Sequence, residues 1–68
     1  MGSIAKVIEV LAQSEEGWED AAQIAVTEAS KTVRNVRHLY VKELQADVED
    51  GKIVNYRLNA KITFVVEE

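Results

Sequence analysis

The side chains able to do chemistry are few and scattered in this sequence. Cysteine is absent, and the chain has one histidine, His38. The glycines lie far apart at Gly2, Gly17 and Gly51, so there is no Gly-rich phosphate loop. No serine has the flanking glycines of a nucleophile elbow. We therefore expect a binding protein and not an enzyme.

Carboxylates are more numerous and raise the question of a cation site. One short stretch could collect oxygen ligands for calcium, or could complement the dipole at a helix start; its members are Glu15, Glu16, Glu19 and Asp20. The acidic residues at 47–50 do not match the EF-hand spacing. In a symmetric assembly, one carboxylate repeated about an axis could still build a site. Candidates of that kind are Glu43, Asp47 and the Glu67-Glu68 tail.

Length and charge narrow the classes of partner. The chain has 68 residues and a mass of 7.6 kDa, with a net charge of −4 and a pI near 4.9. An acidic surface disfavours nucleic acid and anionic membranes, and no apolar run approaches the roughly 20 residues of a membrane helix. We expect a single domain over residues 1–68, located in the cytoplasm. A core this small is usually supported by disulfides, metals or self-association, and we expect self-association.

The elements that position these side chains follow from hydrophobic periodicity. Residues 53–66 alternate apolar and polar side chains without a break, which predicts a long strand with one buried face. Residues 39–48 alternate more weakly, and Asp50-Gly51 between the two runs predicts an antiparallel hairpin. Residues 4–12 are rich in β-branched side chains and predict a first strand, whose buried face the pattern leaves open.

Between the first two strands, the spacing of three and four predicts a helix over residues 15–34. Ser14 is the expected N-cap. The apolar face is mostly alanine, which would let the helix pack closely on the sheet, and Trp18 on that face is expected to anchor the core or a subunit contact. Basic residues would complement the dipole at the helix end, namely Lys31, Arg34 and Arg37. The predicted fold class is α+β, in the order strand-helix-strand-strand.

Several of these features, taken in order, resemble the dodecin family. The matching residues are a KVIEV first strand, Ser14-Glu15-Glu16-Gly17 before an Ala-rich helix, Lys31-Thr32-Val33-Arg34-Asn35-Val36, Tyr40-Val41, the Asp50-Gly51 hairpin and Lys61-Ile62-Thr63-Phe64. The resemblance covers nearly the whole chain. It implies a three-stranded antiparallel sheet wrapped around one helix, twelve chains assembled into a hollow shell, and binding and storage of a flavin such as riboflavin or FMN.

Two positions depart from the flavin-binding pattern of that family. His38 stands where those members carry a Trp that stacks on the flavin ring, and Arg57 stands where they carry a Gln that hydrogen-bonds its pyrimidine edge. Imidazole offers a smaller stacking surface than indole. Arginine can donate to ring carbonyls or hold a phosphate or carboxylate, but it cannot accept from a ring N–H. The resemblance therefore implies an altered, weaker flavin pocket around His38 and Arg57.

Other interpretations of the same residues stay open. His38 could be a solvated loop residue, and Arg57 could form a salt bridge with a carboxylate such as Glu43 on the neighbouring strand. Some dodecins bind coenzyme A through basic residues at positions matching Gln45 and Val65, so that ligand is not expected here. A subgroup without the Trp binds calcium, and the alternative function is a flavin-free dodecin that binds calcium or other divalent cations, or is mainly an assembly shell.

Overall fold

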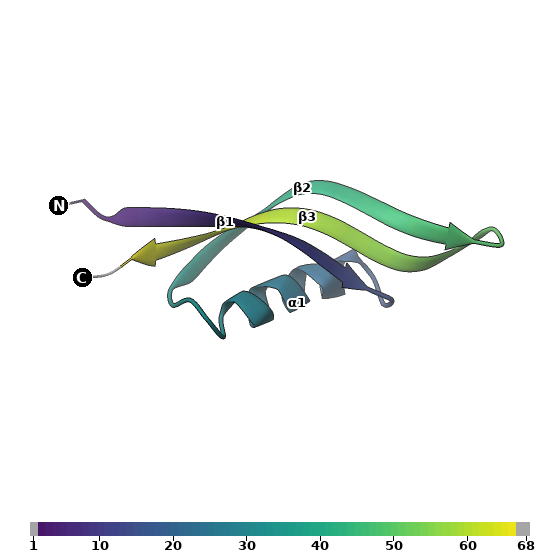
Figure 1. Ribbon diagram of the computed structural model, residues 1–68, viewed down its shortest axis with the longest axis horizontal. Helices are drawn as coiled ribbons and strands as arrows, with labels where there is room; N and C mark the ends of the chain where they lie inside the picture. Colours follow the sequence, from purple (N-terminus) through teal and green to yellow (C-terminus); the bar gives the residue numbers. More distant parts are fainter. Residues whose placement is uncertain (1, 67–68) are drawn as a thin grey trace.

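The computed structural model describes residues 2–66 as three strands and one helix, which confirms the predicted α+β order. The elements are β1 (Ile4–Ser14), α1 (Trp18–Ala29), β2 (Val36–Glu49) and β3 (Lys52–Val66). The sheet is antiparallel with the order β1-β3-β2, so the last strand lies in the centre. Figure 1 shows α1 on one face of the curved sheet and the β2–β3 hairpin reaching past the helix.

The core lies between α1 and the centre of β3. Leu58, Ala60 and Ile62 have no exposed surface, as the alternation of residues 53–66 predicts. The helix contributes Ala21, Ala25 and Ala29, all buried. Because alanine side chains are short, the helix backbone can approach the sheet closely, and Leu58 and Ile62 are the only large side chains that are fully buried among residues 2–66.

The sequence did not decide which face of β1 is buried. In the structure, the buried face is the one whose residues lie opposite the buried, apolar residues of β3. Ile8 and Val10 lie opposite Ile62 and Ala60 and pack against the core. The other parity faces away from the helix, and Leu11 on that face is 56% exposed. The partner strand decides the face because a strand can bury only the parity that its neighbour buries.

The start of α1 differs from the prediction, since Ser14 is not its N-cap. Ser14 ends β1, and Gly17 occupies the cap position without a side-chain hydrogen bond. The Ser14 hydroxyl instead accepts from the Glu16 amide at 2.9 Å and donates to the Asp20 carboxylate at 2.6 Å. Ser14 therefore joins the end of β1 to the first turn of the helix.

The end of α1 was also predicted wrongly, at residue 34 instead of Ala29. The amides of Thr32 and Val33 both bond to the Ala29 carbonyl, so the chain forms turns after the helix. Asn35 then adopts a positive φ of 61°, which redirects the chain into β2. The last turn of α1 contains no basic residue, and the dipole role predicted for Lys31, Arg34 and Arg37 is wrong. Lys31 pairs with Glu28 at 2.7 Å on the surface.

The predicted Asp50-Gly51 turn is confirmed, with positive φ angles of 51° and 77° at its two residues. Both angles suit a hairpin turn of the primed type. Both hairpin strands are longer than predicted, and the pairing of β2 with β3 shifts register at three places. Among residues 2–66, no helix is long and apolar enough to cross a membrane.

Candidate functional site

His38 and Arg57 lie on the same face of the sheet, the one turned away from α1. Arg57 pairs with Gln13 of β1 and with Gln45 of β2, and His38 pairs with Thr63 of β3. Residues 57 and 63 are an even number of positions apart on β3, so their side chains point to the same face. That face is opposite to the one on which Leu58 is buried. Both residues predicted to bind a flavin therefore belong to one open surface, here called the outer face of the sheet.

One chain does not bring these two residues together. His38 lies opposite Thr63, six positions from Arg57 along β3 by subtraction of the two numbers. At 3.3–3.4 Å per residue, six positions correspond to about 20 Å. Within one chain, His38 and Arg57 therefore do not line one compact site.

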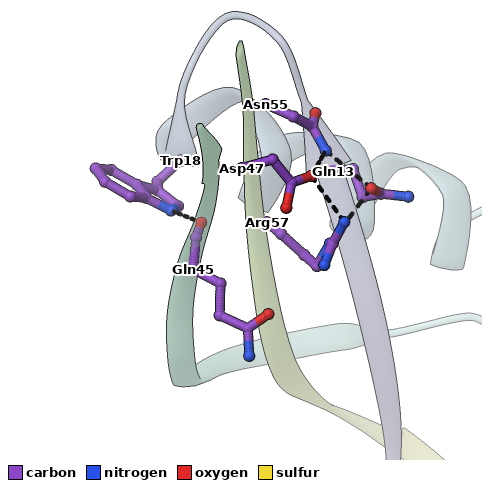
Figure 2. Close-up of polar contacts among 6 residues, drawn as sticks. All are labelled: Gln13, Trp18, Gln45, Asp47, Asn55 and Arg57. Carbon is purple, nitrogen blue, oxygen red and sulfur yellow. Dashed lines mark hydrogen bonds and ion pairs between the residues drawn. The ribbon is translucent and has the colours of Figure 1, made fainter. Parts of the chain in front are cut away.

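Arg57 belongs to a hydrogen-bonded group that spans all three strands, here called the Arg57 network and made of Gln13, Asp47, Asn55 and Arg57. Arg57 Nη2 lies 2.8 Å from Asp47 Oδ2, and Arg57 Nε donates to Gln13 Oε1 at 3.4 Å. Asn55 Nδ2 donates to the same two oxygens, at 3.2 Å and 2.9 Å. Figure 2 shows the four side chains converging on the outer face.

The ion pair of Arg57 corrects the partner expected from the sequence. Its carboxylate is Asp47, and Glu43 pairs with Asn59 further along the hairpin. The side chains of Arg57 and Asp47 are 31% and 44% exposed, so solvent screens their attraction. A partly exposed pair contributes at most about 1 kcal/mol to folding. Its clearer effect is to hold the guanidinium in place and to neutralise its charge.

His38 is exposed at the start of β2, immediately after a register shift between Val36 and His38. Such irregularities change the direction in which a side chain points. None of the side-chain hydrogen bonds within residues 2–66 involves its imidazole. His38 therefore lies in a strand and not in a loop, and its ring is accessible to a ligand or to a second subunit.

Trp18 lies beside the Arg57 network but on the helix side of the sheet (Figure 2). Its indole Nε1 donates to the Gln45 carbonyl at 3.0 Å. Its ring meets Tyr56 edge to face, with centroids 4.9 Å apart. Trp18 therefore packs against the core, which is one of the two roles predicted for it.

The carboxylates do not form a cation site within the part of the chain that the structure describes, residues 2–66, where no group of three potential ligands occurs. Of the predicted candidates, Asp47 is bound by Arg57, which makes it a poor cation ligand. Asp20 receives the Ser14 hydroxyl at the start of the helix. The tail Glu67-Glu68 lies outside the described residues. Glu43 stays a prediction.

Sequence reasoning missed the contributions of Gln13 and Asn55 and the pairing of Asp47 with Arg57. Gln13 could have been found from the parity of β1 once its partner strand was known. The pairing of Asp47 could not have been found from the sequence. Counting back from the turn pairs Glu49 with Lys52 and Val48 with Ile53, but the register then shifts by one residue between Val48 and Asp47.

Comparison with known proteins agrees with this architecture. A sequence model of the Dodecin family matches residues 4–67. A dodecin of Thermus thermophilus is 34% identical over 68 residues, covering 100% of this chain and 99% of the relative. A crystal structure of a variant of that dodecin superimposes with a TM-score of 0.92, at 33% identity, and covers 98% of this chain and 100% of the other. The calcium-chelating calcium dodecin of Mycobacterium tuberculosis superimposes with a TM-score of 0.81, at 35% identity, and covers 96% and 93%.

Proposed function

This chain belongs to the dodecin family, and from that premise we propose that it binds and stores a flavin. Dodecins are small binding proteins that assemble as oligomers. The proposed particle is a homododecamer in the cytoplasm, with residues 1–68 of each subunit acting as one dodecin-like domain. The proposed ligand is riboflavin or FMN, held between subunits by Arg57 of one and His38 of another.

The main support for this proposal is that Arg57 and His38 lie on the same open face. Six positions along β3, at the rise per residue of a strand, separate them by about 20 Å. A flavin needs a flat surface for its ring and polar groups for its carbonyl edge. The exposed imidazole of His38 can supply a modest stacking surface. Arg57 is held by Asp47 and can donate to a carbonyl oxygen. A second subunit that lies across the outer face would bring the two halves together.

Self-association is supported by the apolar side chains that one helix leaves uncovered. On β2, Leu44 and Val48 are 56% and 60% exposed, although Leu44 shares the helix side of the sheet with Leu58. Both β1 and β2 are edge strands with free backbone groups. A lone chain of this size would expose a large share of its apolar surface, and partner subunits would bury it.

The alternative function is binding of calcium or another divalent cation by a flavin-free shell. It is favoured by the similarity to the calcium dodecin of M. tuberculosis. It is disfavoured by the ion pair of Asp47 with Arg57, which occupies one of the carboxylates expected to take part. The two functions differ in their ligands and can be separated in one preparation.

Riboflavin and FMN are titrated into ligand-free protein, quenching of flavin fluorescence is recorded, and the same sample is run on a sizing column. The proposal predicts quenching by a particle of about twelve subunits. Arg57→Ala should weaken binding about tenfold or more, as loss of a charged hydrogen-bond donor requires. Lys52→Ala, at the exposed start of β3, is the matched control and should bind as the wild type does. A particle that binds neither flavin but melts at a higher temperature with calcium would overturn the flavin proposal in favour of the alternative.

A further inference from the structure

We propose that Asp50, at the tip of the β2–β3 hairpin, is a site of spontaneous covalent modification that moves its peptide bond with Gly51 from the main chain to the side chain. The two residues form the turn between Glu49 and Lys52, the last pair of the hairpin. The product is an isoaspartyl linkage, and its free α-carboxylate is the group that isoaspartate-methylating repair enzymes recognise. Because the reaction takes place at the turn, it is independent of flavin or cation binding.

The turn is open to solvent and lies away from the core. Asp50 and Gly51 are both exposed. Among residues 2–66, and apart from the chain neighbours of Gly51, no atom lies within 4 Å of the place that a Cβ on Gly51 would occupy. Figure 1 shows this turn at the end of the hairpin that reaches past α1. The tip can therefore open locally while the core between α1 and the centre of β3 stays intact.

Both reacting groups are available. Within residues 2–66, the Asp50 carboxylate takes part in no side-chain hydrogen bond and no ion pair. The Gly51 amide donates in none of the turn and loop hydrogen bonds of the same residues. Gly51 also has no Cβ to hinder the approach of its nitrogen to the carboxyl carbon. The reaction therefore needs only a rotation within the turn that brings these two atoms together.

The reaction needs no oxidant, reductant or cofactor. The Gly51 amide nitrogen attacks the side-chain carboxyl carbon of Asp50, a C–N bond forms and the C–OH bond breaks. The hydroxyl leaves with the amide hydrogen as water, which gives a cyclic succinimide. Water then adds to the main-chain carbonyl carbon of the ring and its C–N bond breaks, so that Gly51 stays bonded to the side-chain carbon. The composition is unchanged, but the main chain gains the Asp50 Cβ, which lengthens the turn.

The other two aspartates lack these conditions, since only Asp50 is followed by glycine. Asp20 lies in the first turn of α1, where the helix fixes the main chain, and its carboxylate accepts from Ser14. Asp47 lies within β2, its carboxylate accepts from Arg57, and a β-branched residue follows it. The chain thus contains two internal controls for the reaction at Asp50.

The test is incubation of the assembled wild-type protein for weeks in mildly acidic buffer, with elution volume as the check that the assembly persists. Mild acid raises the fraction of neutral carboxyl groups, which lose water more readily than carboxylates. Peptide mapping with an endoprotease that cleaves before aspartate but not before isoaspartate locates the modified residue, and enzymatic methylation quantifies it. Residue 50 should accumulate at least about tenfold more isoaspartate than residues 20 and 47, which corresponds to about 1.4 kcal/mol in activation free energy.

Two variants and the unfolded chain separate the claim about the folded protein from the reactivity of the dipeptide. Asp50→Glu keeps the charge but would have to close a larger ring, so it should stay unmodified. Asp50→Asn forms the same succinimide by losing ammonia, suits a positive φ, and should react faster than the wild type. If isoaspartate forms at residue 50 in urea-unfolded protein but not in the folded assembly, the proposal is overturned. Equal amounts at all three aspartates of the folded protein would also overturn it.

Discussion

Trp18 and Tyr56 pack edge to face, with ring centroids 4.9 Å apart and planes inclined by 78°. The same indole donates its N–H to the Gln45 carbonyl at 3.0 Å. These contacts connect the first residue of α1 to β3 and to β2. The helix start is thus held at the place where the hairpin begins to extend beyond it, next to the Arg57 network.

We expect the ring and the N–H of Trp18 to contribute separately. Trp18→Phe keeps an aromatic ring against Tyr56 but removes the donor to Gln45, and should lower the free energy of unfolding by about 1 kcal/mol. Trp18→Ala removes both and should cost about 3 kcal/mol. Urea unfolding followed by far-UV circular dichroism at fixed protein concentration measures both values. Equal losses in the two variants would show that the ring contact contributes nothing beyond the hydrogen bond.

The Ser14 hydroxyl should be coupled to Asp20 across the β1–α1 junction. Ser14 is 8% exposed and donates to the carboxylate at 2.6 Å, a charge-assisted hydrogen bond. Ser14→Ala should lower the free energy of unfolding by about 1–2 kcal/mol. A double-mutant cycle with Asp20→Ala should give a coupling energy of about 1 kcal/mol. Additive effects in the double variant would contradict the contact.

Leu58 should be the most sensitive position of the core to truncation. It has no exposed surface, and it is one of two large side chains among residues 2–66 that are fully buried. Leu58→Ala should therefore leave a cavity and lower the free energy of unfolding by about 2–5 kcal/mol. Thr27→Ala on the exposed side of α1 is the control and should change it by less than about 0.5 kcal/mol. Thermal unfolding at one protein concentration compares the three proteins, and a tolerant Leu58 would mean that the core repacks.

His38→Trp tests whether the start of β2 touches the flavin. An indole at this exposed position should stack on the ring better than an imidazole, and riboflavin should bind about tenfold more tightly. Tyr40→Trp, on the same exposed face of the same strand, is the control and should leave the affinity unchanged. The readout is fluorescence titration of riboflavin. An unchanged affinity for His38→Trp would place the ligand away from this residue.

The order of elements, the buried parity of β3 and the Asp50-Gly51 turn are local properties of the sequence, and each was predicted from it. Alternation over residues 53–66 required one buried face, and Leu58 and Ile62 lie on it. The ends of α1 were predicted wrongly, and at the C-terminal end the reason is that the helical spacing of apolar residues continues from Ala29 to Val33. In the structure the amides of Thr32 and Val33 bond to the Ala29 carbonyl, so the helix ends at Ala29, and the positive φ of Asn35 then redirects the chain into β2.

The register of β2 against β3 was decided only by the tertiary structure. Counting back from Glu49 and Lys52 would pair Asp47 with Val54 and place its carboxylate on the helix side of the sheet. The register shift between Asp47 and Val48 pairs it instead with Asn55, on the face that carries Arg57. A one-residue shift moves a side chain to the opposite face. The sequence by itself therefore determined the strands, the helix and the family, and three-dimensional pairing determined which carboxylate meets Arg57.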